Sequence, residues 1–212
     1  MSTQVESSSG NVASLRELMR GRPTLAAVAA HLEALPRHAR VHEIRALTAN
    51  QVRDLWQLAT AAAPLTVDDM APASLPPFQA VSWQGRNSMP AFAVMEKRFF
   101  RDREGQVWGC NVQGMEWATG PGYFALGPHP ERQGELLIDY SRLPSLAPPG
   151  WPAITPNSRG LSFLVFHNLR DEMRRVCEGV VIGKATRNGK ETGLAGAIWH
   201  QYFAMALQDA PH

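Results

Sequence analysis

Short segments with alternating side chains, separated by tight turns, occupy residues 81–129 and constrain the fold more than any other part of the chain. In residues 92–100, side chains two apart share a face, and both faces combine charged with apolar residues. Residues 102–105 (Asp-Arg-Glu-Gly) have the composition of a hairpin turn, and residues 107–112 are predicted to return as the partner strand. A parallel return needs a connection of about a dozen residues, so the pattern predicts antiparallel neighbours.

The second half of the chain continues this pattern, beginning with a turn at residues 120–122. Residues 168–177 are ambiguous, because Leu169, Met173 and Val176 have helical spacing. We expect a short helix or turn there, with a strand pair as the alternative. The remaining strands are predicted at residues 123–126, 135–140, 161–166, 180–186 and 199–207, with a hairpin signal at Asn188-Gly189.

The amino-terminal third has helical periodicity instead. Apolar residues recur at helical spacing from Leu25 to Leu35, immediately before Pro36. Thr48 followed by Gln51 matches a capping box at the start of a further helix. The chain therefore divides into a disordered tail (1–11), a helical subdomain (12–70), a proline-rich linker (71–77) and an antiparallel β domain (78–212).

The composition is that of a globular protein, with 44% apolar and 19% charged residues among 212. A formal net charge of +2 and scattered basic residues argue against a nucleic-acid partner. The first residues lack the basic and apolar segments of a signal peptide, and no stretch is apolar enough to span a bilayer, so we expect no membrane partner. We expect a cytoplasmic protein in which Cys110 and Cys177 are buried free thiols.

Five short segments combine glycine, proline, aromatic and charged residues: 85–92 (GRNSMPAF), 97–99 (KRF), 120–124 (GPGYF), 138–140 (IDY) and 148–152 (PPGWP). They resemble sequence blocks of a bacterial protein family without assigned function, over most of the chain after about residue 35. That resemblance implies no catalytic residues, because no activity comes with it. The segment Trp83-Gln84-Gly85 is similar to the first strand of lipocalin-like barrels, which implies a β-barrel.

Motifs for common enzyme chemistries are missing from the sequence. It contains no nucleophile elbow, phosphate-binding loop or dinucleotide fingerprint. His38 and His42 lie one helical turn apart and could share a metal, but no third ligand accompanies them. We therefore expect neither a metal nor a cofactor.

Polar and aromatic side chains on the predicted strands are the candidate ligand-binding residues. A charge inside a barrel needs a partner, so Glu96 or Asp139 with Arg98 is a plausible internal ion pair. The alternative is a structural ion pair on the outer face of the sheet. His167 and Asp171 could form an oriented general base, or only a surface hydrogen bond. The predicted ligand-binding set is Arg86, Asn87, Glu96, Arg98, Trp108, Asn111, Tyr123, Asp139, Tyr140, Trp151 and His167; the sequence identifies no catalytic residue.

A proline-rich segment at residues 143–158 carries five prolines and one large aromatic residue, Trp151. Loops of this length without secondary structure are often functional. We expect the Trp151 ring to dock on the β domain, either over the barrel mouth or across its outer wall, and the mouth is the preferred interpretation.

These patterns together predict an α+β protein, in which a helical subdomain packs on an antiparallel lipocalin-like β-barrel or strongly curved sheet. The predicted function is binding of a small, partly apolar molecule in the barrel interior. An enzyme that uses the same cavity for acid-base chemistry is one alternative, and a protein-interaction module is another. The sequence does not indicate the oligomeric state.

Overall fold

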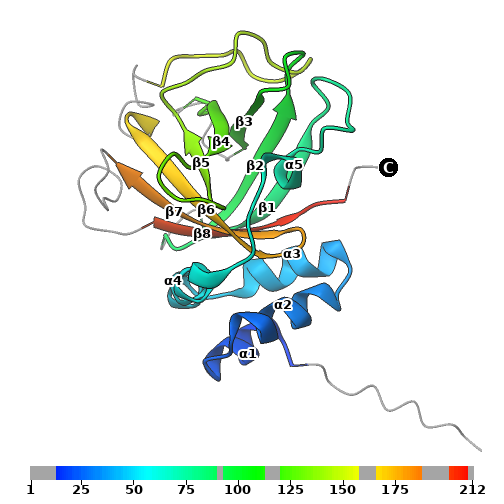
Figure 1. Ribbon diagram of the computed structural model, residues 1–212, viewed down its shortest axis with the longest axis vertical. Helices are drawn as coiled ribbons and strands as arrows, with labels where there is room; N and C mark the ends of the chain where they lie inside the picture. Colours follow the sequence, from blue (N-terminus) through cyan, green and yellow to red (C-terminus); the bar gives the residue numbers. More distant parts are fainter. Residues whose placement is uncertain (1–12, 90–92, 113–119, 158–165, 188–200, 210–212) are drawn as a thin grey trace, which may run out of the picture.

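A closed, antiparallel β-barrel forms the centre of the computed structural model, which describes residues 13–89, 93–112, 120–157, 166–187 and 201–209. The strands follow one another in chain order, and β1 pairs with β8 to close the barrel (Figure 1). In the described ranges the strands are β1 Val81–Asn87, β2 Val94–Arg101, β3 Val107–Val112, β4 Phe124–Pro128, β5 Leu136–Asp139, β6 Leu169–Cys177, β7 Val180–Arg187 and β8 Gln201–Leu207. The predicted α+β class with an antiparallel lipocalin-like barrel is confirmed.

Connections between consecutive strands lie at alternate ends of the barrel. The β1–β2, β3–β4, β5–β6 and β7–β8 connections share one end, which we call the loop end. The other end carries the short β2–β3, β4–β5 and β6–β7 turns. The predicted β2–β3 turn is present: Gly105 has φ +84°, and the Asp102 carboxylate accepts hydrogen bonds from the N–H groups of Glu104 and Gln106.

Helices precede the barrel, and side-chain caps fix several of their starts. They are α1 Leu15–Arg20, α2 Leu25–Glu33, α3 Arg37–Ala46, α4 Ala49–Leu58 and α5 Val67–Met70, with a 3-10 turn at Ala59–Ala61. The predicted capping box begins α4. The Thr48 hydroxyl accepts from the Gln51 N–H at 3.3 Å, and the Gln51 side chain accepts from the Thr48 N–H at 2.9 Å.

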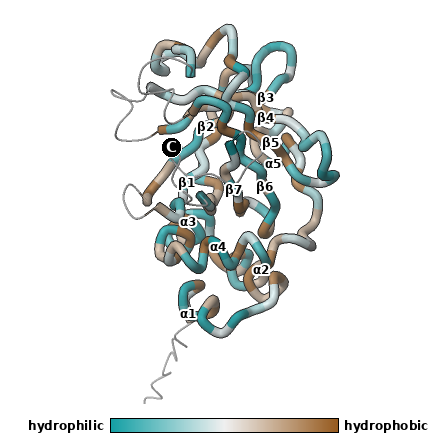
Figure 2. Tube along the Cα trace, turned by 90° about the vertical axis from the view of Figure 1, so that its left-hand side faces the viewer, coloured by the Kyte–Doolittle hydropathy of each residue, from teal (hydrophilic) through white to brown (hydrophobic). Residues whose placement is uncertain are grey.

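Helices α1 to α4 form a layer on the outer wall of the barrel, below the strands in Figure 1. Their apolar residues cluster with the outward-facing side chains of β7 and β8, among them Ile182 and Ala204. The neighbouring Val181 and Met205 face the barrel interior and belong to a second apolar cluster. Strands β7 and β8 are therefore buried on both faces. Along the helices, hydrophobic and hydrophilic residues alternate, as expected of elements with one covered face (Figure 2).

The end of the barrel opposite the loop end is closed by α5 and its flanks. Leu65, Met70 and Ala71 join the interior apolar cluster. The indole N–H of Trp83, a residue with no exposed surface, donates to the Met70 carbonyl at 3.0 Å. We call this end the α5 end.

The proline-rich segment runs over the outer wall on the side away from the helices (Figure 1). The Trp151 ring packs edge-on against Phe100, with centroids 5.4 Å apart, and lies 6.4 Å from the ring of Tyr123. The Tyr123 hydroxyl donates to the Pro152 carbonyl at 2.7 Å. Phe100 and Tyr123 both point out of the barrel, so the preferred position of Trp151 over the barrel mouth is wrong and the outer-wall alternative holds.

A second preferred prediction was wrong. Residues 169–177 form strand β6, whereas we expected a short helix or turn there. A register irregularity between Arg175 and Cys177 changes which face the following residues occupy. Leu169 and Met173 lie inside the barrel, whereas Val176, three positions after Met173, falls on the outer face by ordinary alternation and packs against the helices. The three residues with helical spacing therefore occupy two faces of one strand, and the irregularity places Cys177 on the same side as Val176.

The strand pattern predicts that Phe99, Trp108, Phe124, Ile138 and Val165 are buried, and all but Val165 lie in the described residues. Phe99, Phe124 and Ile138 have no exposed surface, whereas Trp108 is only half-buried. The predicted strand at 161–166 lies largely outside the described residues, and the turn at 188–189 lies wholly outside them. Cys110 and Cys177 are buried free thiols, as predicted.

Candidate functional site

Four polar residues meet inside the barrel and are the strongest candidate for a site. We call Lys97, Asn111, Tyr140 and Asp171 the Lys97 cluster. Lys97 is on β2 and pairs in register with Asn111 of β3, Tyr140 directly follows β5, and Asp171 is on β6. Alternation along each strand turns these side chains inward, where Met95 and Phe99 flank Lys97 on β2.

The Lys97 ammonium uses all three of its N–H groups inside the cluster. It donates to the Asn111 side-chain oxygen at 2.6 Å, to the Tyr140 hydroxyl at 2.6 Å and to the Asp171 carboxylate at 3.1 Å. The side chains of Lys97 and Asp171 are only 3% and 4% exposed. The cluster is thus a satisfied ion pair in a dry environment, as a buried charge requires.

Tyr140 and Asn111 complete the hydrogen bonding. The Tyr140 hydroxyl lies 3.1 Å from the Asp171 Oδ2 atom, to which it can donate. The Asn111 amide donates to the Gly122 carbonyl and to the Tyr140 hydroxyl, both at 3.2 Å. Hydroxyl and amide groups can both donate and accept, so this half of the cluster can exchange partners with a polar ligand.

Aromatic rings surround the ammonium. The Lys97 nitrogen lies 5.2 Å from the ring centroids of Phe124 and Phe203 and 5.3 Å from that of Tyr140. Phe166 stacks on Tyr140 with centroids 5.3 Å apart, and it packs where a side chain at Gly122 would otherwise lie. The rings form an apolar lining with a weak attraction for a cation.

Burial changes the acid-base properties of two members of the cluster. Loss of hydration lowers the pKa of Lys97, and the neighbouring Asp171 carboxylate opposes that change. Burial also raises the pKa of Tyr140 well above its usual value, and Asp171 adds to this increase. The neutral forms of the amine and of the phenol are both favoured relative to water.

The cluster lies in the half of the barrel nearer the loop end. Asn111 is the penultimate residue of β3, and Tyr140 lies immediately beyond the last residue of β5. The half nearer the α5 end is apolar and contains Val107, Leu126, Leu136, Met173, Val181 and Met205. Among the described residues, the polar cluster thus lies in the half of the interior nearer the loop end.

Only part of the predicted site lies in this cluster. Asn111 and Tyr140 face the interior, as expected of barrel-wall residues. The predicted pair of Glu96 and Arg98 forms at 2.6 Å, but on the outer wall, where the Arg98 side chain is 41% exposed and Glu96 also accepts from the Ser82 hydroxyl. The alternative of an outer-face ion pair is thus correct for these two residues.

Other predicted residues have structural partners outside the interior. The Trp108 indole donates to Asp102 on the outer wall, and the Asp139 carboxylate accepts from Ser141. Arg86 donates to the Leu47 carbonyl at the end of α3. As described above, Tyr123 and Trp151 belong to the outer-wall packing. Their polar groups hold the fold together instead of forming one site.

Two predicted residues lie at the loop end without joining the cluster. Asn87 is the last residue of β1, and its side chain accepts from the Met89 N–H at 2.9 Å. His167 is half-buried just before β6. Among the described residues, the hydrogen-bond partners of the Asp171 carboxylate are Lys97 and Tyr140, so its predicted pairing with His167 is wrong.

Sequence reasoning missed Lys97, which is the centre of the cluster. The sequence did contain a signal, because Lys97 shares a strand face with Met95 and Phe99. If that face is buried, the lysine needs a buried partner of opposite charge. The sequence reasoning selected Glu96 and Arg98 instead, because they are opposite charges two positions apart on one predicted strand. Lys97 and Asp171, by contrast, lie 74 positions apart in the chain and no local pattern links them.

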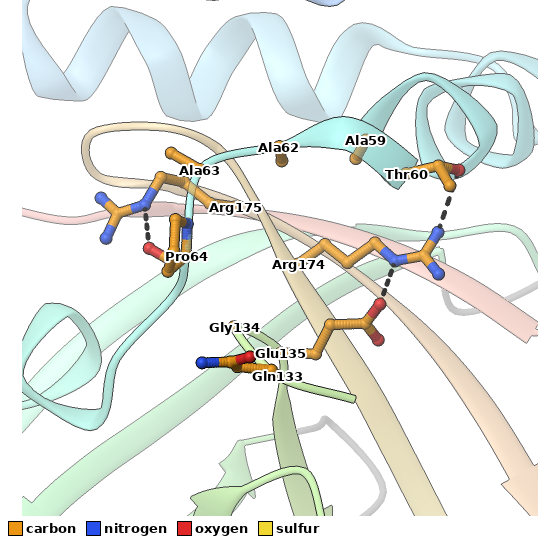
Figure 3. Close-up of a pocket in the computed structure, with 10 residues that line it drawn as sticks. All are labelled: Ala59, Thr60, Ala62, Ala63, Pro64, Gln133, Gly134, Glu135, Arg174 and Arg175. Carbon is orange, nitrogen blue, oxygen red and sulfur yellow. Dashed lines mark hydrogen bonds and ion pairs between the residues drawn. The ribbon is translucent and has the colours of Figure 1, made fainter. Parts of the chain in front are cut away.

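A small surface pocket near the α5 end offers a less favourable site. Its volume is about 80 Å³, and it lies between the 59–64 connection and the start of β5 (Figure 3). Arg174 donates to Glu135 at 2.9 Å, and Arg175 donates to the Pro64 carbonyl at 2.9 Å. The arginines thus attach the connection to the barrel, and the volume is below the several hundred Å³ typical of ligand pockets.

Comparisons with known proteins add no assignment: no family model, curated protein or solved structure matches this chain. The resemblance to a bacterial family stays a prediction. Within the described residues, no group of three histidine, cysteine or carboxylate side chains is arranged to hold a metal ion. No helix in the same part of the chain has the length and apolar character needed to cross a membrane.

Proposed function

We propose that this protein binds a small, partly apolar molecule in the barrel, between the Lys97 cluster and the loop end. The observation that supports this most directly is the buried Lys97–Asp171 pair, 3.1 Å apart and enclosed by aromatic rings. Barrels of about eight strands have interiors that either fill with side chains or hold one small ligand.

A purely structural role explains the cluster less well. Replacing a buried ion pair by apolar residues of similar volume is often neutral or stabilising, by about 1–4 kcal/mol. Among the described residues, apolar side chains line the other half of the barrel interior. A barrel selected only for stability would have the same composition throughout, so the polar half indicates a polar ligand group.

The chemistry of the cluster defines the kind of ligand. An ammonium and a carboxylate in contact have no net charge, which favours a neutral ligand over a strongly charged one. The Tyr140 hydroxyl and the Asn111 amide suit a carbonyl or hydroxyl group, since each can donate or accept. The aromatic rings favour a flat, unsaturated apolar part.

The direct test is native mass spectrometry of the protein purified from its own host. We expect a fraction of the protein to carry one small molecule that is released by denaturation. The Lys97→Met/Asp171→Leu variant removes the polar group and should lose this molecule. Arg98→Met is the matched control, because Arg98 is the next residue along the strand but faces outward, and it should retain the ligand. The proposal is refuted if wild-type protein purified from its host carries no small molecule and also binds no small aromatic alcohol or ketone.

An enzyme that uses the same interior is the second candidate. The lowered pKa of Lys97 beside a neutral phenol is the observation that favours it, because acids and bases in active sites often have altered pKa values. Turnover of the co-purified molecule by wild-type protein, and its loss in Tyr140→Phe, would distinguish the enzyme from a binding protein.

A further inference from the structure

The choice of cation in the barrel is unusual for this chain. Of its 21 lysines and arginines only three are lysines, namely Lys97, Lys184 and Lys190. Lys184 lies on the outward-facing side of β7, next to Ile182 and opposite Tyr202 of β8 in register, and Lys190 lies outside the described residues. A chain that uses arginine for nearly every other cation thus has a lysine at the centre of its barrel.

Arginine and lysine differ in one respect that matters here. A guanidinium stays protonated in proteins, whereas a lysine amine in a buried site can lose its proton and then act as a nucleophile. For a structural ion pair with Asp171 alone, arginine would serve as well or better, because its fork matches a carboxylate. The presence of lysine therefore indicates a use for the amine itself.

We propose that Lys97 captures a small apolar aldehyde or ketone as an imine. This inference rests on the proposed function, because the carbonyl compound is the ligand of the same interior site. It defines the ligand class as a carbonyl compound with an aromatic or unsaturated apolar part.

The reaction balances with the groups present. The Lys97 ammonium gives a proton to Asp171, and the free amine attacks the carbonyl carbon, forming the C–N bond. The carbonyl oxygen takes up that proton through Tyr140 and Asp171, which gives a carbinolamine. The carbinolamine nitrogen then gives a second proton to Asp171, and this proton passes to the hydroxyl group, which leaves as water when the C–O bond breaks. The product is a protonated imine, so the positive charge of the ammonium stays at the same nitrogen and Asp171 is again its carboxylate counter-ion.

The geometry supports each of these roles. The Asp171 Oδ2 atom lies 3.1 Å from both the Lys97 nitrogen and the Tyr140 hydroxyl, so one carboxylate oxygen reaches the attacking atom and the proton donor. The Phe124 and Phe203 rings that face the ammonium would face the iminium in the same way. The dry interior also slows hydrolysis of the imine.

The test uses the full chain with benzaldehyde and sodium cyanoborohydride at pH 7, followed by intact-mass measurement and peptide mapping. Burial lowers the pKa of Lys97, which raises the neutral fraction of its amine, so we expect more benzyl label at Lys97 than at Lys184. Lys184→Arg is the control and should leave labelling of Lys97 unchanged. Lys97→Arg keeps the charge and should abolish the labelling.

Binding of benzyl alcohol, which has no carbonyl group, separates this inference from the proposed function. Lys97 labelling that benzyl alcohol suppresses would support both. A different result would overturn imine formation at Lys97 but not the binding function. In that case native mass spectrometry detects bound benzyl alcohol, while the label is confined to Lys184, Lys190 and the terminal amine. If benzyl alcohol does not bind and Lys97 is not labelled, both ideas fail. Circular dichroism of Lys97→Arg confirms that a lost signal does not reflect unfolding.

Discussion

Replacing Lys97 by methionine tests whether the ion pair is held in the interior as described. Methionine has a similar length and suits an apolar position, so the change removes the charge with little change in volume. The Asp171 carboxylate then keeps the Tyr140 hydroxyl as its hydrogen-bond donor among the described residues. A carboxylate that is 4% exposed cannot turn to solvent for compensation.

The size of the effect follows from that burial. Removing one partner of a buried pair typically costs about 3–5 kcal/mol, because the other charge is left uncompensated. The double variant Lys97→Met/Asp171→Leu removes both charges and should lie within about 1 kcal/mol of the wild type or above it. Asn111 and Tyr140 retain their mutual hydrogen bond of 3.2 Å in both variants.

Urea unfolding followed by tryptophan fluorescence measures these differences, with the m-value as a check that unfolding stays two-state. Arg98→Met provides the comparison on the same strand, and its exposed pair should contribute at most about 1 kcal/mol. The reasoning is refuted if Lys97→Met unfolds within 1 kcal/mol of the wild type, or if the double variant is less stable than Lys97→Met alone.

Three further variants test other parts of the fold. Trp151→Ala should lower the free energy of unfolding by about 2–3 kcal/mol, because its half-buried ring packs on the outer wall. Ligand binding should not change. A variant that loses binding at unchanged stability would instead indicate that Trp151 covers the barrel mouth. Thr48→Ala removes a capping box and should cost about 1 kcal/mol in urea unfolding, whereas no change would mean that α4 starts elsewhere. Burial raises the pKa of Cys177 from 9.0 to about 12, so the unfolded thiol ionises first and stability should fall as pH rises from 9 towards 12. Cys177→Ala should show a shallower fall over that range in pH-dependent melting, and an identical slope would contradict the burial of the thiol.

Alternation and turn composition were enough to predict the antiparallel sheet and several of its strands. They could not show which face of β2 lies inside the barrel. Phe99 on the inner face and Phe100 on the outer face are both fully buried, because Phe78 and Trp151 cover Phe100 from outside. A strand covered on both faces has no exposed side from which the interior could be inferred.

The candidate site was harder to predict than the fold, for a related reason. Its members come from strands that the barrel brings together only after it closes, and Asp171 lies on a strand whose spacing resembled a helix. Glu96 and Arg98, two residues apart on one strand, are a local pattern and were found at once. The residues of the Lys97 cluster are linked only through tertiary contacts, which a single sequence does not reveal.

The burial of β8 on both faces makes unfolding of the two layers cooperative. Phe203 and Met205 pack in the barrel interior, while Tyr202 and Ala206 pack against the helices. Opening the seam between β1 and β8 therefore breaks both apolar clusters, and we expect the helical layer and the barrel to unfold together. Amide hydrogens of β8 and of the helices packed on it, α3 and α4, should exchange with solvent at one common free energy, so that the helices and the barrel behave as one folding unit.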